Sequence, residues 1–134
     1  MLNHDEQIDD LLLEGLKIIQ KRGCFRYGTD AVVLSDFAKK YIKKGAKVLD
    51  IGTGTGILPI LLSAKTEARK LVGLEIQHEM AVLAGRSVKM NEEAGVLQKE
   101  RIEIVNGDIT KAREIFSGRS FDAVVTNPPY KRKG

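Results

Sequence analysis

A proline corner is the part of this sequence with the most chemical content: Asn127-Pro128-Pro129-Tyr130 follows the apolar run of residues 121–126. Two prolines fix φ and remove two backbone donors, so the segment can neither continue a strand nor enter a helix interior. Asn127 is held extended because a proline follows it. The corner suits a planar amino group, since the amide oxygen and a carbonyl accept its two N–H bonds while the tyrosine stacks on its π face. The alternative is an ordinary Asn-Pro turn.

A glycine-rich loop is the second candidate site, with Gly52, Gly54 and Gly56 following Asp50. Glycine lacks a Cβ, so the backbone can approach a ligand closely. A dinucleotide fingerprint needs glycine at position 57, where this chain has Ile57. The spacing therefore indicates a ligand other than a dinucleotide. We expect Asp50 to accept hydrogen bonds from the amides of the loop.

Two further acids end apolar runs. Glu75 can accept both hydroxyls of a ribose, as acids at this place in nucleotide-binding sheets do; the alternative is an acid facing a helix dipole. Asp108 could accept from an adenine amino group, or it could cap the helix that follows. One carboxylate serves only one of these roles well. His4 and His78 stand alone without metal-ligand spacing, so we expect no metal site.

These side chains must be positioned by secondary structure, and the hydrophobic pattern predicts strands over residues 47–51, 70–75, 101–106 and 121–126. Helices are expected over residues 56–64, 77–92 and 109–116. This alternation predicts the α/β class, a parallel sheet with helices on both faces. Right-handed crossovers give the strand order 3-2-1-4. The glycine loop and the proline corner then meet at the crevice between the first and fourth strands.

The front of the chain differs from this pattern. Residues 9–20 are rich in leucine and isoleucine, and residues 23–28 suggest a turn or short strand. Thr29 or Asp30 can cap a helix that runs to Ile42. No internal repeat, linker or low-complexity segment is present.

Composition narrows the function classes. The chain has 134 residues, 43% hydrophobic and 30% charged, which suits one globular domain. No apolar run approaches the ~20 residues of a membrane span, and the acidic start of the chain is unlike a secretory or transit peptide. Cys24 is the only cysteine, so we expect a reducing cytoplasm. The net charge is +4, and Lys131, Arg132 and Lys133 follow the corner; this slightly favours a polyanionic partner such as RNA.

Together, the 50–56 loop, Glu75, Asp108 and the 127–130 corner resemble, in order and spacing, the motifs of class I S-adenosylmethionine-dependent N-methyltransferases. Residues 8–12, 16–20 and 25–34 are similar to the bacterial family that N6-methylates an adenine beside the anticodon of valine tRNA. The resemblance implies a Rossmann-like fold, S-adenosyl-L-methionine as cofactor and tRNA as partner. It also implies residues 1–45 as a segment packing on the cofactor site, and residues 46–134 as the cofactor-binding half of a methyltransferase domain.

The resemblance implies roles for individual residues. The catalytic set is Asn127, Pro128, Pro129 and Tyr130. The cofactor set is Tyr27, Thr29, Asp30, Asp50, Gly52, Thr53, Gly54, Gly56, Glu75, Ile76, Asp108, Ile109 and Asn127. Residues 27–30 are expected near the methionine end of the cofactor.

Three alternatives stay open: a protein-glutamine (release factor) N5-methyltransferase, a ribosomal RNA guanine N2-methyltransferase, and a non-catalytic fragment that binds cofactor or RNA. Enzymes of the resembled class continue past the corner with three more strands. We therefore expect these residues to be the amino-terminal part of such an enzyme, truncated after its fourth strand, so that activity of this chain alone is in question. The fourth strand would then be an exposed edge through which copies of the chain could associate.

Overall fold

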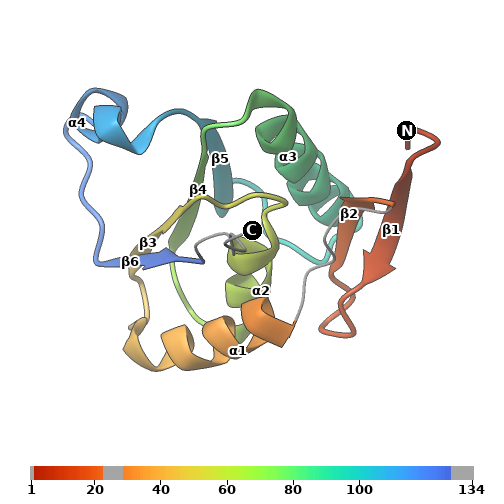
Figure 1. Cartoon of the computed structure of the whole chain (residues 1–134). Coiled ribbons are helices and arrows are strands. Elements are labelled where there is room, and N and C mark those ends of the chain that lie inside the picture. The colour runs from red at the N-terminus through yellow and green to blue at the C-terminus, as the bar shows by residue number, and fades with distance from the viewer. Residues whose placement is uncertain (1, 23–28, 128–134) are drawn as a thin grey trace, which may run out of the picture.

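The computed structural model describes residues 2–22 and 29–127. Its centre is a parallel sheet in the order β5-β4-β3-β6, with β3 (Lys47–Ile51) and β4 (Lys70–Glu75) as the inner strands. The outer strands are β5 (Ile102–Asn106) and β6 (Ala123–Thr126). Counted along the chain, this is the order 3-2-1-4, so the predicted α/β class and strand order are confirmed (Figure 1).

Helices cover both faces of this sheet. One layer contains α1 (Thr29–Ala38), which η1 (Lys39–Tyr41) extends, α2 (Ile57–Lys65) and α3 (His78–Glu93). The other layer contains η2 (Ile109–Lys111) and α4 (Ala112–Ile115). Side chains alternate between the layers along β3, because successive residues of a strand point to opposite faces. Val48 packs with the first layer and Leu49 with the second.

An antiparallel hairpin, β1 (Glu6–Asp10) and β2 (Lys17–Lys21), precedes the sheet. The sequence pattern did not indicate it. The hairpin lies against α3 (Figure 1), where side chains of the helix bond the free edge of β2. Asn91 accepts from the Lys17 amide at 2.9 Å and donates to the Lys17 carbonyl at 2.8 Å. The Ser87 hydroxyl accepts from the Ile19 amide at 2.9 Å.

An ion pair fixes the other strand of the hairpin. Both carboxylate oxygens of Glu6, a side chain only 3% exposed, accept from the Arg86 guanidinium at 2.8 and 2.9 Å. Arg86 thereby lowers the pKa of Glu6. The hairpin is thus held on the flank of α3. Residues 23–28, with Cys24 and Tyr27, lie outside the described residues, so packing of residues 1–45 on the cofactor site stays a prediction.

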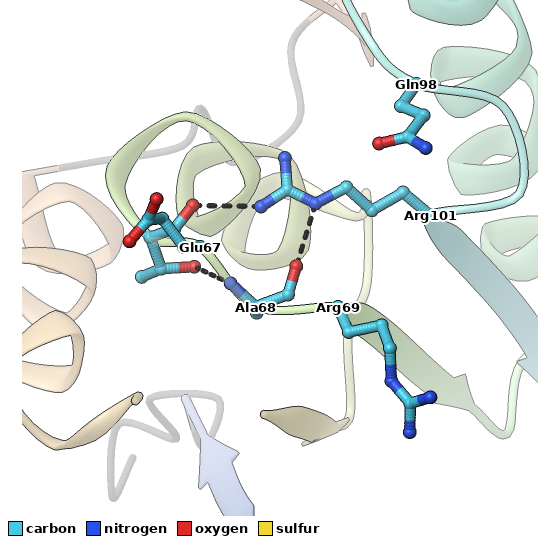
Figure 2. A pocket seen from close by; sticks show the side chains of 6 residues that line it. Glu67, Ala68, Arg69, Gln98 and Arg101 are labelled. Atoms are coloured by element: carbon cyan, nitrogen blue, oxygen red, sulfur yellow. Dashed lines mark hydrogen bonds between the residues drawn. The ribbon is translucent and has the colours of Figure 1, made fainter. Parts of the chain in front are cut away.

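Arg101 ties the start of β5 to the end of α2, around a cavity of about 370 Å³ at the amino-terminal edge of the sheet (Figure 2). Its guanidinium donates to the carbonyls of Ser63, Thr66 and Ala68 at 2.7, 2.9 and 3.0 Å. Carbonyls at a helix carboxyl end lack intrahelical partners, and a cation there also opposes the helix dipole. Burial lowers the pKa of Arg101.

Replacing Arg101 with methionine should reduce the free energy of unfolding by about 2 kcal/mol, because charge-assisted bonds are lost and water replaces only some of them. Chemical denaturation measures the change. Arg69→Met is the matched control, since Arg69 lines the same cavity but its side chain forms no hydrogen bond or ion pair to described residues. An equal reduction of the free energy of unfolding in the two variants would contradict the stabilising role assigned to the hydrogen bonds of Arg101.

Within residues 2–22 and 29–127, no helix is long and apolar enough to cross a membrane.

Candidate functional site

The glycine-rich loop joins β3 to α2 and is fastened to the end of β4. The amides of Gly52 and Thr53 donate to the Leu74 carbonyl at 2.8 and 3.0 Å. The amide of Gly56 turns back to the Thr53 carbonyl at 2.9 Å. Three φ angles are positive, +74° at Gly52, +56° at Gly54 and +82° at Gly56. Only glycine adopts this conformation without strain, so the spacing of the glycines is set by the backbone path.

Two of these glycines have different surroundings. A Cβ at Gly56 would lie 3.2 Å from the Cβ of Ala84 in α3, so this glycine allows the loop and α3 to pack closely. A Cβ at Gly54 would meet no atom within 4 Å. The backbone at Gly54 therefore faces open space, where a ligand can approach it.

Glu75, at the carboxyl end of β4, holds the loop from the other side. Its Oε1 accepts from the Gly54 amide at 2.8 Å and its Oε2 from the Gln77 amide at 3.0 Å. The side chain is only 7% exposed. Each oxygen keeps a second lone pair, so both can also accept from hydroxyl groups of a ligand.

The expectation that Asp50 holds the loop amides was wrong, since Leu74 and Glu75 accept from the amides of residues 52–54. Asp50 lies within β3, paired with Gly73 of β4, and is 3% exposed. Thr53 packs over Gly73, where a Cβ would come within 2.7 Å of the Thr53 hydroxyl. The Asp50 Oδ1 and the Thr53 Oγ1 are both buried without a partner among the described residues.

Burial therefore raises the pKa of Asp50 to about 7; the nearby Thr53 hydroxyl opposes the shift, and the charge of Glu75 adds to it. The two side chains approach each other without a hydrogen bond of normal geometry. Buried polar atoms are nearly always bonded. These two atoms are therefore exceptions to this rule among the described residues.

The end of β5 supplies the third acid. Asp108 Oδ1 accepts from the Thr110 amide at 2.9 Å and caps η2, and this bond lowers the pKa of Asp108. The capping role is therefore present, and the second carboxylate oxygen stays available for a ligand. Ile76 and Ile109, 63% and 41% exposed, follow the ends of β4 and β5 and supply apolar surface at the same edge.

Asn106 helps to build this edge of the sheet, and sequence reasoning missed it. Its side-chain amide donates to the backbone carbonyls of Glu75 and Ile76 at 2.8 and 3.1 Å. The backbone amide of Gly107 donates to the same Glu75 carbonyl at 2.9 Å. Asn106 thus sets the spacing between the two strand ends. The partners are 30 and 31 residues away in the sequence, so no local pattern could indicate them.

The first residue of the proline corner lies at this same edge. β6 pairs with β3 so that Thr126 is opposite Ile51, and the Thr126 hydroxyl donates to the Ile51 carbonyl at 3.0 Å. Asn127 therefore follows β6 where the glycine loop follows β3, and its side chain is exposed. Pro128, Pro129 and Tyr130 lie outside the described residues, as does the 131–133 basic run.

The structure brings the glycine loop, Glu75, Asp108 and Asn127 to the carboxyl edge of one sheet, where open α/β sheets bind ligands. Thr29 and Asp30 begin α1. The carboxyl groups of Asp50, Glu75 and Asp108 at this edge suit a ligand with hydroxyl, amino or cationic groups. Among the described residues, no group of three or more His, Cys, Asp or Glu side chains could hold a metal ion.

Comparison with known proteins gives a consistent family. The profile of the methyltransferase small domain family matches residues 16–134. A tRNA1(Val) (adenine(37)-N6)-methyltransferase of Tolumonas auensis is 32% identical over 115 residues, which cover 84% of this chain and 44% of the relative. The enzyme of the same name from Porphyromonas gingivalis strain W83 is 32% identical over 117 residues, with the same coverage.

Among solved structures, a SAM-dependent methyltransferase from Agrobacterium tumefaciens aligns with a TM-score of 0.68 at 18% identity, over 96% of this chain and 41% of that one. This likeness supports the fold. The chain spans less than half the length of these relatives.

Proposed function

The chain belongs to the methyltransferase small domain family, and from this we propose that it binds S-adenosyl-L-methionine and methylates the N6 amino group of an adenine in tRNA. One observation carries the proposal. The pairing of β3 with β6 brings Asn127 beside a glycine loop whose Gly54 amide is bonded by Glu75. A site for a nucleoside cofactor and an acceptor of amino hydrogens therefore share one edge.

The residues at this edge fit the cofactor. Glu75 has free lone pairs for two ribose hydroxyls, and Ile76 with Ile109 offers apolar surface for an adenine ring. Asp108 can accept from the adenine amino group through its second oxygen. Gly54 leaves open space for the methionine part. The unpartnered Asp50 and Thr53 oxygens lie beneath the loop that receives it. Gly52 and Gly56 shape that loop, and Tyr27, Thr29 and Asp30 stay predictions for the methionine end.

The reaction needs orientation more than acid–base chemistry. The bound cofactor supplies an electrophilic methyl group on a sulfonium. The Asn127 side-chain oxygen and the Pro128 carbonyl would accept the two N6 hydrogens, so that the nitrogen lone pair points at the methyl carbon. With the amine held in this way, the N6–C bond would form as the S–C bond breaks, and the extra N6 proton would pass to water. Holding both partners in line is the contribution proposed for these residues, while the cofactor carries the chemistry.

Capture of the base is assigned to the rest of the corner. Tyr130 would stack on an adenine flipped out of the anticodon region, as enzymes that modify bases require. The substrate itself is supported by the relatives, whose names specify adenine 37 of tRNA1(Val). The net charge of +4 also favours a polyanion. A tRNA substrate agrees with the predicted cytoplasmic location.

A methyl-transfer assay tests the function. A version of the protein extended to the length of its relatives is incubated with labelled S-adenosylmethionine and, in separate reactions, total tRNA, a peptide release factor and ribosomal RNA. We expect label in tRNA, with N6-methyladenosine as the only new nucleoside by mass spectrometry. Label in glutamine of the release factor or in guanine would overturn the proposed substrate. Binding of cofactor without transfer to any of the three would favour a non-catalytic role.

Gly54→Val should abolish measurable S-adenosylmethionine binding. The new side chain enters the open space that the ligand needs, and it forces a β-branched residue to a φ of +56°. Isothermal calorimetry on the folded variant measures this. Gly118→Val is the matched control, because Gly118 also has a positive φ and open surroundings but lies before β6, away from the site. Unchanged affinity in folded Gly54→Val would remove the loop from the cofactor site.

A further inference from the structure

A cluster of lysines lies at the end of α1, where the sequence has no acid between Asp36 and Asp50. Its four exposed members follow one another through η1 and the next turn: Lys39, Lys40, Lys43 and Lys44. Asp36 pairs with Lys39 at 3.6 Å and with Lys65 at 2.8 Å. Among the described residues, Lys40, Lys43 and Lys44 have no ion-pair partner. This cluster therefore offers three uncompensated positive charges.

Two exposed aromatic rings stand among these lysines. Phe37 and Tyr41 are 57% and 67% exposed, and their ring centroids are 5.4 Å apart with an interplanar angle of 47°. Large apolar side chains seldom gather on a surface without a partner. Aromatic rings between unpaired cations are the combination on which single-stranded nucleic acids bind, because bases stack on the rings while phosphates meet the charges.

A groove connects this surface to the proposed active site. It has a volume of about 320 Å³, and it is lined by Leu34, Phe37, Ala38, Tyr41 and Ile42 on one side and by Ala123, Val124, Val125 and Thr126 of β6 on the other. In Figure 1, α1 lies below β6, and the chain runs through the two elements in opposite directions. β6 therefore begins beside the lysines and ends directly before Asn127. Its four residues span about 13 Å, which one stem-loop can bridge.

We propose that Lys40, Lys43, Lys44 and Tyr41 form a second RNA-contacting surface, which holds the phosphate backbone beside the nucleotide presented to Asn127. The inference rests on the proposed function and deepens it. The lysines neutralise phosphates and release their counterions, a gain that does not depend on sequence. Tyr41 supplies a stacking platform for an unpaired base. This surface positions the RNA, whereas the corner selects the reacting atom.

A second copy of the chain is the competing occupant. β6 is an outer strand, and an outer strand presents unpaired backbone groups to another chain. Such pairing would use the groove and the β6 edge, yet it would leave the three lysines without counter-charges. RNA accounts for both the charges and the aromatic rings, so we argue for RNA.

The test uses fluorescence anisotropy with a labelled anticodon-type RNA stem-loop at several salt concentrations. The triple variant Lys40→Gln, Lys43→Gln, Lys44→Gln is compared with Lys17→Gln, Lys89→Gln, Lys99→Gln, which removes equal charge from exposed lysines elsewhere. We expect the first to bind roughly 10-fold or more weakly, with its salt slope reduced by about 0.7–0.9 for each phosphate that is no longer neutralised. Tyr41→Ala should weaken binding roughly 10-fold, and Tyr41→Phe little.

Equal losses of affinity in the two triple variants, or an unchanged salt slope, would overturn the inference. The same holds if sedimentation shows a dimer that Tyr41→Ala dissociates while RNA affinity is unchanged, because the surface would then join two copies. RNA binding that depends on the lysines but yields no N6-methyladenosine supports this surface and refutes only the proposed reaction. Methylation that persists while the cluster variant binds RNA like the wild type refutes only this surface.

Discussion

Asn127→Ala, in a version of the protein extended to the length of its relatives, is expected to slow methyl transfer roughly 100- to 1,000-fold, the range found when one fixed polar group that stabilises a transition state is removed. Affinity for S-adenosylmethionine should stay nearly unchanged. The reason is the place of Asn127, which follows β6 and is proposed to meet the target amine, whereas Glu75, Asp108 and the glycine loop are proposed to meet the cofactor. Single-turnover kinetics and calorimetry on the same protein separate the two effects.

The control for this variant is Thr126→Val. It removes the hydroxyl bond to the Ile51 carbonyl at 3.0 Å but keeps the amide of Asn127, and it should change the rate only modestly. A similar reduction of the methyl-transfer rate in both variants would mean that the position of the end of β6 matters, rather than the side-chain amide of Asn127. If Asn127→Ala instead weakened cofactor binding and kept its rate at saturation, the assigned role would be refuted.

Asp50→Asn should change how stability depends on pH. The pKa of Asp50 is raised from 3.8 to about 7 in the folded protein, so the folded state binds its proton more tightly than the unfolded state does. This contribution to stability is complete below pH 3.8 and is lost as pH rises through about 7. Asparagine mimics the neutral acid and does not titrate. The free energy of unfolding of Asp50→Asn, relative to wild type, should therefore rise by about 4 kcal/mol between pH 4 and 8.

Urea denaturation at a series of pH values measures this difference. Asp108→Asn is an informative control, because its bond with the Thr110 amide lowers the pKa of Asp108. For Asp108 the wild type gains stability as pH rises through the lowered pKa of the folded state. The free energy of unfolding of Asp108→Asn, relative to wild type, should therefore fall rather than rise with pH. Parallel stability curves for wild type and Asp50→Asn would show that the carboxyl group is hydrated rather than desolvated.

The sheet was predictable because parallel, buried strands appear in a sequence as short apolar runs that end at polar or glycine residues. The runs at β3, β4 and β6 are of this kind, and handedness then fixed their order. The hairpin was not predictable by this route. The outer edge of β2 is bonded by side chains of α3, which are 68 and 74 residues away in the sequence. A local hydrophobic pattern cannot indicate a strand edge that is bonded by a helix.

Within the site, residue types and places were predictable but some hydrogen bonds were not. Asp50 is close to the loop in sequence, yet the acid that bonds the Gly54 amide is Glu75, 21 residues away. Both belong to β-strands, and the pairing of the strands rather than their spacing decides which carboxylate reaches the loop. Asp108 was predicted with two alternative roles, and its capping bond is present. The roles of Tyr27, Pro128, Pro129 and Tyr130 stay predictions.

Because β2 is bonded to α3, hydrogen exchange of the β2 amides can show how the hairpin opens. The amides of Lys17 and Ile19 donate to Asn91 and Ser87, whereas the alternation of an antiparallel ladder turns the amides of Ile18 and Gln20 toward β1. Neighbouring amides of one strand therefore sense two different openings, separation from the helix and fraying of the hairpin. If the hairpin lifts from α3 as a unit, Lys17 and Ile19 will exchange first, together and at the same free energy, before the ladder beside them opens.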